Sequence, residues 1–238
     1  MSTDTGDSIN ACSGQWSFGG DTPKNFDQHV SKSVPLYFEG HQLIANLSQH
    51  FVPHGGSVIH VGCSTGVLTQ CIANDLSGRR VDILGVDIEE NMIIEAKSRD
   101  NPNKINFVTS DFLDLDISPS SINLIVCHYV IQFIHPSVRQ CYLDKIYSSL
   151  CWGGALILFE KTRASDARFQ DIFTSSYHDF KISSGYSPSN VYAKQQSLKS
   201  VLEPFSTSGN IDMMKRAGFV DIETVFQFIP FKGFLAIK

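Results

Sequence analysis

The stretch Val58-Ile59-His60-Val61-Gly62-Cys63-Ser64-Thr65-Gly66 decides the fold. An apolar, β-branched run ends in a glycine-flanked turn, and a helical pattern begins at Val67. Glycines allow a ligand to approach the backbone, and the next helix directs its free N–H groups at that ligand. The stretch therefore predicts a nucleotide-binding turn between a strand and a helix. His60 is unusual, because turns of this kind more often carry a carboxylate there.

Strand and helix patterns alternate five times along the chain from this turn. Apolar runs predict strands at 57–62, 81–87, 105–109, 123–127 and 155–159, and helical periodicity predicts helices at 36–51, 67–76, 89–99 and 136–150. A helix at 211–217 precedes strands at 219–228 and 233–237, and the short connection at Pro230 requires these two strands to be antiparallel. We expect an α/β fold: a doubly wound, seven-stranded sheet with an antiparallel last strand and ligands at the carboxyl ends of the strands.

The domain organisation follows from composition. Residues 1–15 are rich in Ser, Thr, Asp and Gly, which predicts a disordered tail. Residues 16–238 form one predicted domain, with a largely helical cap inserted at about 163–205.

The net charge and the number and spacing of the cysteines limit the possible partners and the cellular location. The net charge of −5 and the scattered 19 Lys and Arg residues disfavour a nucleic-acid partner. We expect no membrane association, because no leader and no apolar run of membrane-spanning length occur. Six cysteines without a C-x-x-C pair indicate reduced thiols and a cytoplasmic protein. The histidines lack metal-ligand spacing, so no metal is expected; a homodimer is left open.

The cofactor is predicted from residues at the strand ends. The pattern Gly62-x-x-x-Gly66 lacks the G-x-G-x-x-G spacing of dinucleotide sites, which disfavours NAD. Asp87 ends the second strand about 20 residues after the turn, where it can bind both ribose hydroxyls or act as a helix N-terminal charge. Asp111 and Phe112 suit adenine, although Asp111 can also be a helix cap. With the antiparallel final strand, these features resemble the class I S-adenosylmethionine (SAM)-dependent methyltransferases.

A set of short sequence blocks spread over nearly the whole chain carries a closer resemblance. The blocks are Trp16-x-Phe18, Ser33-Val34-Pro35-x-Tyr37, Gly62-Cys63-Ser64, Gln132-Phe133, Leu143-Asp144-Lys145-Ile146-Tyr147, Gly153-Gly154-Ala155-Leu156, Glu160-Lys161, His178-Asp179-Phe180-Lys181, Gly185-Tyr186-Ser187 and Ala217-Gly218-Phe219. Through these blocks the chain is similar to the carboxy-S-adenosylmethionine synthase family, whose enzymes rebuild SAM using prephenate. By this resemblance the cofactor-binding positions are Tyr37, Gly62, Cys63, Ser64, Asp87, Ile88, Asp111, Phe112 and His128.

Four positions of the expected site depart from that family. His60 replaces an acid, His128 an Asn and Tyr177 a His, and Gln195 stands where the family has an arginine for the extra carboxylate, beside Lys194. A neutral amide cannot reproduce the bidentate grip of a guanidinium.

These departures suggest a different reaction of SAM, and they make His60, His128, Tyr177 and Gln195 the candidate catalytic residues. Loss of an acid near the α-amine favours its neutral form, which can attack Cγ to give azetidine-2-carboxylate and 5′-methylthioadenosine. This resembles the azetidine-2-carboxylate synthases, which are SAM cyclases. His60 or His128 would take the proton, while Tyr177 would steady the sulfonium. Possible companions of Tyr177 are Trp16, Tyr37, Phe133 and Tyr186.

The alternatives are a small-molecule methyltransferase, a carboxy-SAM synthase with a modified carboxylate site, and a cofactor-binding protein without enzymatic activity. Cys63, although it lies in the turn, is expected to be an inert small residue rather than a nucleophile.

Overall fold

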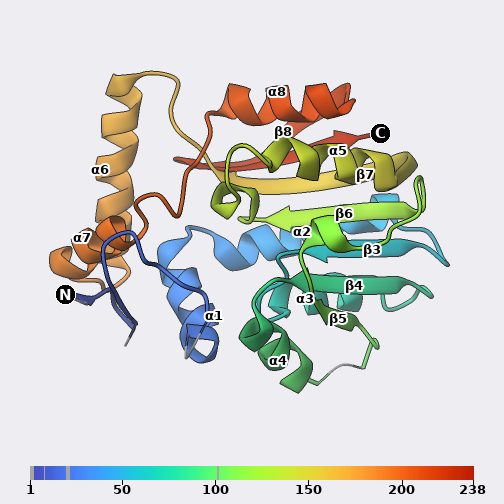
Figure 1. The fold of residues 1–238 in the computed structure, drawn as a ribbon, viewed down its shortest axis with the longest axis horizontal. Coiled ribbons are helices and arrows are strands. Elements are labelled where there is room, and N and C mark those ends of the chain that lie inside the picture. The colour runs from blue at the N-terminus through green and yellow to red at the C-terminus, as the bar shows by residue number, and fades with distance from the viewer. Residues whose placement is uncertain (1–2, 8, 20–21, 101) are drawn as a thin grey trace.

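A seven-stranded sheet forms the centre of the computed structural model, which describes residues 3–7, 9–19, 22–100 and 102–238. The strand order is β5-β4-β3-β6-β7-β9-β8 (Figure 1). The strands are β3 (Ser57–Val61), β4 (Asp82–Asp87), β5 (Asn106–Thr109), β6 (Ile122–His128), β7 (Leu150–Lys161), β8 (Asp221–Phe228) and β9 (Phe231–Ile237).

The predicted fold class is confirmed, including the reversed last strand. Strands β3 to β7 pair in parallel, whereas β9 is antiparallel to both β7 and β8. The β8–β9 turn at Ile229 and Pro230 is too short for a crossover, so β9 has to reverse its direction.

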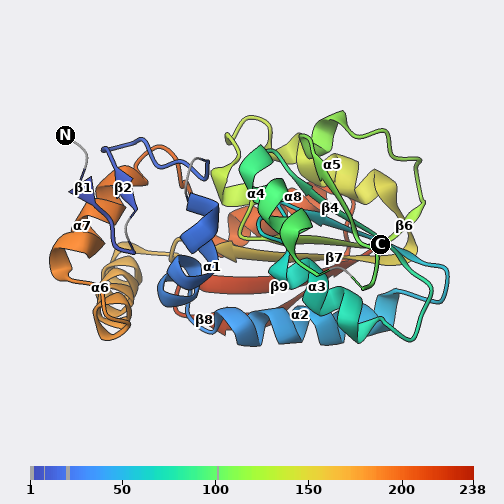
Figure 2. The same ribbon diagram turned by 90° about the horizontal axis from the view of Figure 1, so that it is seen from below.

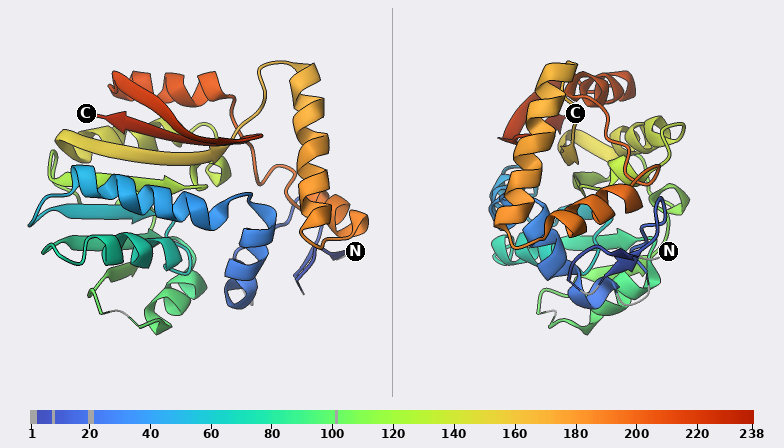
Figure 3. Two further views of the ribbon diagram at one scale, coloured as in Figure 1. Left: turned by 180° about the vertical axis from the view of Figure 1, so that it is seen from behind. Right: turned by 90° about the vertical axis from the view of Figure 1, so that its left-hand side faces the viewer.

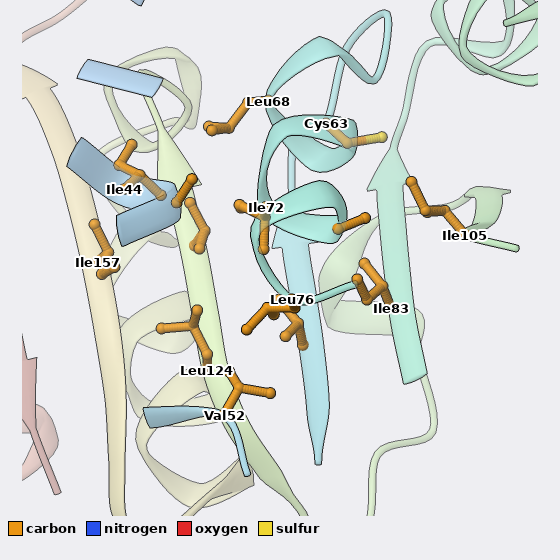
Figure 4. Close-up of a cluster of buried hydrophobic side chains, with 14 of the residues drawn as sticks. Ile44, Val52, Cys63, Leu68, Ile72, Leu76, Ile83, Ile105, Leu124 and Ile157 are labelled. Carbon is orange, nitrogen blue, oxygen red and sulfur yellow. The ribbon is translucent and has the colours of Figure 1, made fainter. Parts of the chain in front are cut away.

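Helices cover both faces of the sheet (Figure 2). Helices α2 (Tyr37–Phe51), α3 (Val67–Asp75) and α4 (Glu90–Ser98) share one apolar cluster with the strands, part of which Figure 4 shows. Helices α5 (Arg139–Ser149) and α8 (Thr207–Ala217) belong to a second cluster on the opposite face. Because successive strand residues face opposite sides, Val58 joins the first cluster and Ile59 the second.

The predicted cap contains two helices, α6 (Ala167–Ser183) and α7 (Pro188–Ser197), which lie beyond the carboxyl ends of the strands with α1 (Thr22–Ser33) (Figures 1 and 3). Asp166 caps α6, and Ser187 with Asn190 forms a capping box on α7. Only Lys181 of α6 is buried, so this helix stands away from the main core.

The predicted disordered tail over residues 1–15 is wrong for the residues that the structure describes. Strands β1 (Thr3–Asp4) and β2 (Asn10–Ala11) form a small antiparallel pair against α7. Ile9, Ala11 and Trp16 build a third apolar cluster with Phe18, Leu198 and Val201. Few of these contacts are local, so composition alone could not reveal them. Residues 3–19 without the undescribed residue 8 are termed the N-terminal strap below.

Three further details differ from the prediction. Helix α1 was not predicted, because its sequence is polar on average and contains few apolar residues. The short 3₁₀ turns η1 (Phe112–Asp114) and η2 (Ile131–Phe133) follow β5 and β6. Strand β7 begins at Leu150 rather than at residue 155, and the predicted turn at Gly153 and Gly154 lies inside this strand near a register shift.

Candidate functional site

A cavity of about 1050 Å³ lies at the carboxyl ends of the strands, under α1, the cap and the strap. The structure brings all of the predicted catalytic and cofactor-binding residues to this cavity. Its lining includes Tyr37, His60, Gly62, Cys63, Ser64, Asp87, Ile88, Asp111, Phe112, His128, Tyr177 and Gln195.

The glycine turn is held in shape by Asp87. The backbone N–H of Ser64 donates to Asp87 Oδ2 at 2.8 Å, and the N–H of Glu89 donates to Oδ1 at 3.0 Å. Burial raises the pKa of Asp87, and these two N–H groups oppose that rise. Gly62 has a φ of 66°, and a Cβ there would collide with the side chain of Val130, so only glycine fits. Asp87 therefore supports the turn and the start of the next helix and lines the cavity, and its binding of the ribose hydroxyls stays a prediction.

The end of β5 supplies a second carboxylate. Asp111 Oδ1 accepts hydrogen bonds from Leu113 N–H at 2.8 Å and from the hydroxyl of Tyr142 at 2.5 Å. Asp111 thus caps the 3₁₀ turn η1 and also lines the cavity. Phe112 is only 2% exposed and packs in the apolar core, whereas Ile88 is 69% exposed at the cavity rim. Ile88 consequently offers more accessible apolar surface to a ligand ring than Phe112 does.

Histidines 41, 60 and 128 gather beneath Tyr37. The His60 Nδ1 atom pairs with the Thr69 hydroxyl at 2.7 Å, and the rings of His41 and His128 lie 4.9 Å apart. Burial lowers the pKa of His60 to about 3 and holds that of His128 well below its usual value. Both rings are therefore neutral and only weakly basic, and the role of His60 or His128 as the proton acceptor stays a prediction.

Aromatic side chains form the wall above the histidines. Tyr177 donates to the Ser33 carbonyl oxygen at 2.8 Å, and Tyr37 lies 5.5 Å from His128 between ring centres. Trp16 and Phe133 also line the cavity, joined through Phe18. Tyr186 was a predicted companion of the sulfonium, but it is not among the described lining residues and instead lies behind His29.

Three lysines lie at the end of the cavity opposite the acids of β4 and β5. The ammonium nitrogens of Lys161 and Lys181 lie 4.4 Å and 4.5 Å from the Tyr177 ring centre, and that of Lys194 lies over Trp16. Among the described residues, none of the three lysines has an acid within ion-pair distance.

The environment of these lysines favours their neutral forms. Burial and the neighbouring Arg163 lower the pKa of Lys161 to about 8. Burial and Lys161 lower that of Lys181 to about 7, and burial with Lys181 holds the pKa of Lys194 well below its usual value. The acids that line the cavity are Asp87, Glu89, Asp111 and Glu203. Asp87 and Asp111 lie at the ends of β4 and β5, which are on the other side of the central strand β3 from β7 and Lys161.

Gln195 and Cys63 complete the comparison with the prediction. Gln195 is exposed at the cavity mouth and brings no charge, but the neighbouring Lys194 is buried in the wall. Burial raises the pKa of the Cys63 thiol, and the nearby Asp87 adds to that rise. The thiol is thus held protonated, as expected for an unreactive small residue.

Sequence reasoning missed two groups of the site. His29 on α1 lines the cavity, yet nothing local distinguishes it from a surface histidine. Lys161 and Lys181 lie in the shared family blocks quoted above, so a signal for them existed.

The cavity fits an adenosyl ligand with an amino-acid tail. It offers a glycine turn, two carboxylates at neighbouring strand ends, and buried nitrogens of His60 and His128 that have no hydrogen-bond partner. In the described part of the chain, no group of three or more His, Cys, Asp or Glu residues is arranged to hold a metal ion. No helix within the described ranges has the length and apolarity needed to cross a membrane.

Comparison with known proteins identifies the family. Residues 58–154 match the model of a methyltransferase domain. The carboxy-S-adenosyl-L-methionine synthase of Nautilia profundicola is 34% identical over 226 residues, which cover 94% of this chain and 95% of the relative. This chain belongs to the carboxy-SAM synthase family. The Staphylococcus epidermidis member is 33% identical over 225 residues, with 94% and 97% coverage.

Solved structures support the fold of this carboxy-SAM synthase family member. A Methanococcus maripaludis protein assigned as a SAM-dependent methyltransferase has a TM-score of 0.62 at 16% identity and covers 94% of this chain and 95% of its own. The plantazolicin methyltransferase BpumL, solved with S-adenosylhomocysteine, has a TM-score of 0.65 at 15% identity, with 92% and 91% coverage. The protein is thus a SAM-dependent enzyme of the class I methyltransferase superfamily, with SAM as its small-molecule ligand.

Proposed function

We propose that this family member acts on SAM itself and closes its methionyl chain to azetidine-2-carboxylate, releasing 5′-methylthioadenosine. The observation that carries the proposal is the charge of the cavity. Acids stand at the ends of β4 and β5, three lysines without acidic partners stand beside β7 and the cap, and a neutral His60 occupies the intervening strand end.

Lys161 favours the nucleophilic form of the substrate, because its pKa of about 8 leaves it largely charged at neutral pH. An α-amine has a reference pKa of about 7.7 to 8.0, and a nearby cation lowers it by disfavouring the ammonium form. In the proposed pose, adenosine lies at Asp87 and Asp111 and the amino-acid tail extends toward Lys161. The α-carboxylate then has a cationic partner, and the α-amine has no carboxylate at the position of His60.

The reaction itself needs alignment more than a protein nucleophile. The amine lone pair forms the N–Cγ bond while the Cγ–S bond breaks and its electrons pass to sulfur. The proton lost when the ammonium becomes a neutral amine passes to solvent. Holding nitrogen and Cγ at attack distance within one molecule can contribute several kcal/mol. Tyr177 and the neighbouring aromatic wall would hold the sulfonium by cation–π contact, at about 0.5 to 2 kcal/mol each.

Carboxylation of SAM is the second candidate, and two observations favour it. The two relatives reported above carry the name carboxy-SAM synthase. The cavity of about 1050 Å³ lies at the upper end of ligand-site sizes, and three lysines without acidic partners suit an anionic carboxylic acid as second substrate. A buried cation without a partner is costly, so an incoming anion would stabilise it.

One assay separates these reactions. The protein is incubated with SAM alone and with SAM plus prephenate, and products are identified by mass spectrometry against a protein-free control. Azetidine-2-carboxylate from SAM alone supports cyclisation. A carboxylated SAM that forms only with prephenate shows instead that the enzyme carboxylates SAM. S-adenosylhomocysteine that forms only with an added acceptor would instead indicate methyl transfer.

A Gln195→Arg variant provides the matched comparison. It restores the guanidinium of the family at the mouth of the cavity, where Gln195 is exposed and the change is tolerable for folding. If the pocket keeps the layout of its relatives, the variant gains a prephenate-dependent product. Absence of azetidine-2-carboxylate from the wild type, under conditions where SAM measurably binds, would exclude cyclisation.

A further inference from the structure

Asp7 of the N-terminal strap and His29 of α1 form a buried pair at the cavity. Asp7 Oδ2 lies 3.0 Å from His29 Nδ1, and the Tyr186 hydroxyl donates to the same Oδ2 at 2.5 Å. Lys32 Nζ lies 2.5 Å from Asp7 Oδ1 and fixes the other oxygen. The carboxylate is thus held from three sides, and the histidine ring is held with it.

The pairing determines which nitrogen of His29 carries the proton. An ionised carboxylate only accepts hydrogen bonds, so Nδ1 must be the donor and Nε2 keeps a free lone pair. The Nε2 atom is buried and has no hydrogen-bond partner, and the His29 residue is only 3% exposed. A buried acceptor without a partner costs free energy unless a ligand satisfies it.

The fold places this acceptor between the glycine turn and the lysines. Thr65 of the turn donates to Asp27 Oδ1 at 2.5 Å, which ties α1 to the turn two residues before His29. On the other side, Trp16 stacks on the His29 ring with centres 5.5 Å apart, and Lys194 lies over Trp16. His29 also lines the cavity.

We propose that His29 Nε2 accepts a hydrogen bond from the α-amino group of SAM and holds its nitrogen toward Cγ, with Asp7 as the positioning residue. The inference rests on the proposed function, to which it adds the residue that binds the reacting nitrogen. The lysines would take the α-carboxylate, which leaves the adjacent amino group for His29. The ring acts as an acceptor and not as the base, since burial and Lys194 lower the pKa of His29 to about 4.

A purely structural role is the competing explanation, because the same pair anchors the strap on α1. The two roles differ in which part of the ligand they affect. S-adenosylhomocysteine carries the α-amino group, whereas 5′-methylthioadenosine lacks the whole amino-acid tail. Loss of the amino contact weakens only the first ligand, while a distorted strap weakens both.

The first measurement is calorimetric binding of both ligands to wild type, His29→Phe and His50→Phe. His50 is exposed on α2 and is not among the described lining residues of the cavity, so it controls for removal of an imidazole. We expect His29→Phe to lower the ratio of S-adenosylhomocysteine affinity to methylthioadenosine affinity about tenfold. His50→Phe leaves that ratio unchanged. An unchanged ratio in His29→Phe, with both ligands bound, would overturn the proposal.

The second measurement uses the wild type only and therefore does not depend on the folding of a variant. In ¹⁵N-histidine-labelled protein, S-adenosylhomocysteine should shift the Nε2 resonance of His29 and methylthioadenosine should leave it in place. Equal responses to the two ligands contradict the contact. If neither ligand binds, the proposed function fails and the inference with it. If the contact is present but no azetidine-2-carboxylate forms, only the cyclisation fails.

Discussion

Replacing Lys161 by methionine tests whether the charge of one cavity lysine lowers the pKa of its neighbour Lys181. Both Lys161 and Lys181 contact the Tyr177 ring, so their ammonium nitrogens lie at most about 9 Å apart. At an effective dielectric constant of about 20, two charges at that distance repel by roughly 1.8 kcal/mol. This energy corresponds to about 1.3 pKa units.

The expected result is a more basic Lys181. Burial and the Lys161 charge lower its pKa to about 7, and removal of the Lys161 charge should raise that value by about one unit. Methionine retains the apolar length of the lysine stem, so packing around Tyr177 is preserved. The pKa is measured by NMR titration of the lysine side chains, with Lys181 assigned by its absence in Lys181→Arg.

The control and the functional readout use the same samples. Lys215→Met changes an exposed lysine on α8 and should leave the titration of Lys181 unaltered. If cyclisation is the reaction, Lys161→Met also moves the acidic limb of the rate profile to higher pH, because the α-ammonium loses a repelling neighbour. A titration of Lys181 that is the same in wild type and Lys161→Met would refute the proposed repulsion between the two lysines.

Three further predictions concern the turn and the histidines. Asp87→Asn removes an ionised acceptor from two backbone N–H groups and should weaken methylthioadenosine binding at least tenfold. Binding is measured by calorimetry, and circular dichroism checks that the variant is folded. Gly62→Ala should lower the free energy of unfolding by about 1 to 3 kcal/mol in urea, since φ is 66° and Val130 blocks a Cβ; Gly55→Ala, also at positive φ but in open space, is the comparison for backbone strain alone. The pKa of His128 is lowered on folding, so its stabilising share is present above pH 6.5 and is lost as pH falls. Wild type should therefore lose up to about 2 kcal/mol more stability than His128→Asn between pH 7.5 and 5, and equal losses would contradict this.

The sheet and the nucleotide-binding edge were predictable because their signals are local. The β-branched run before Gly62, the carboxylate at Asp87 and the short turn at Pro230 each depend on neighbouring residues only. These features determined the strand types and the edge to which the ligand side chains point.

The strap and its contacts were not predictable, because they join distant parts of the chain. Asp7 lies in a polar segment whose composition indicates disorder, and its partner Tyr186 is 179 residues away. The role of His29 depends on that pairing. The weak basicity of His60 was not predictable for a related reason: burial by α2 and α3 is a tertiary property, and it lowers the pKa of the ring.

The large sequence separation between the N-terminal strap and helix α7 has a consequence during protein synthesis. Asp4 receives a hydrogen bond from Asn190, which lies 186 residues later in the chain. At about 5 to 20 residues per second, a ribosome adds those residues in roughly 10 to 40 s. During that interval the strap has none of its α7 partners, and the cavity has no closed end. Folding of the strap is consequently a late event that follows completion of α7, and a nascent chain stalled before α7 should expose the strap to proteases.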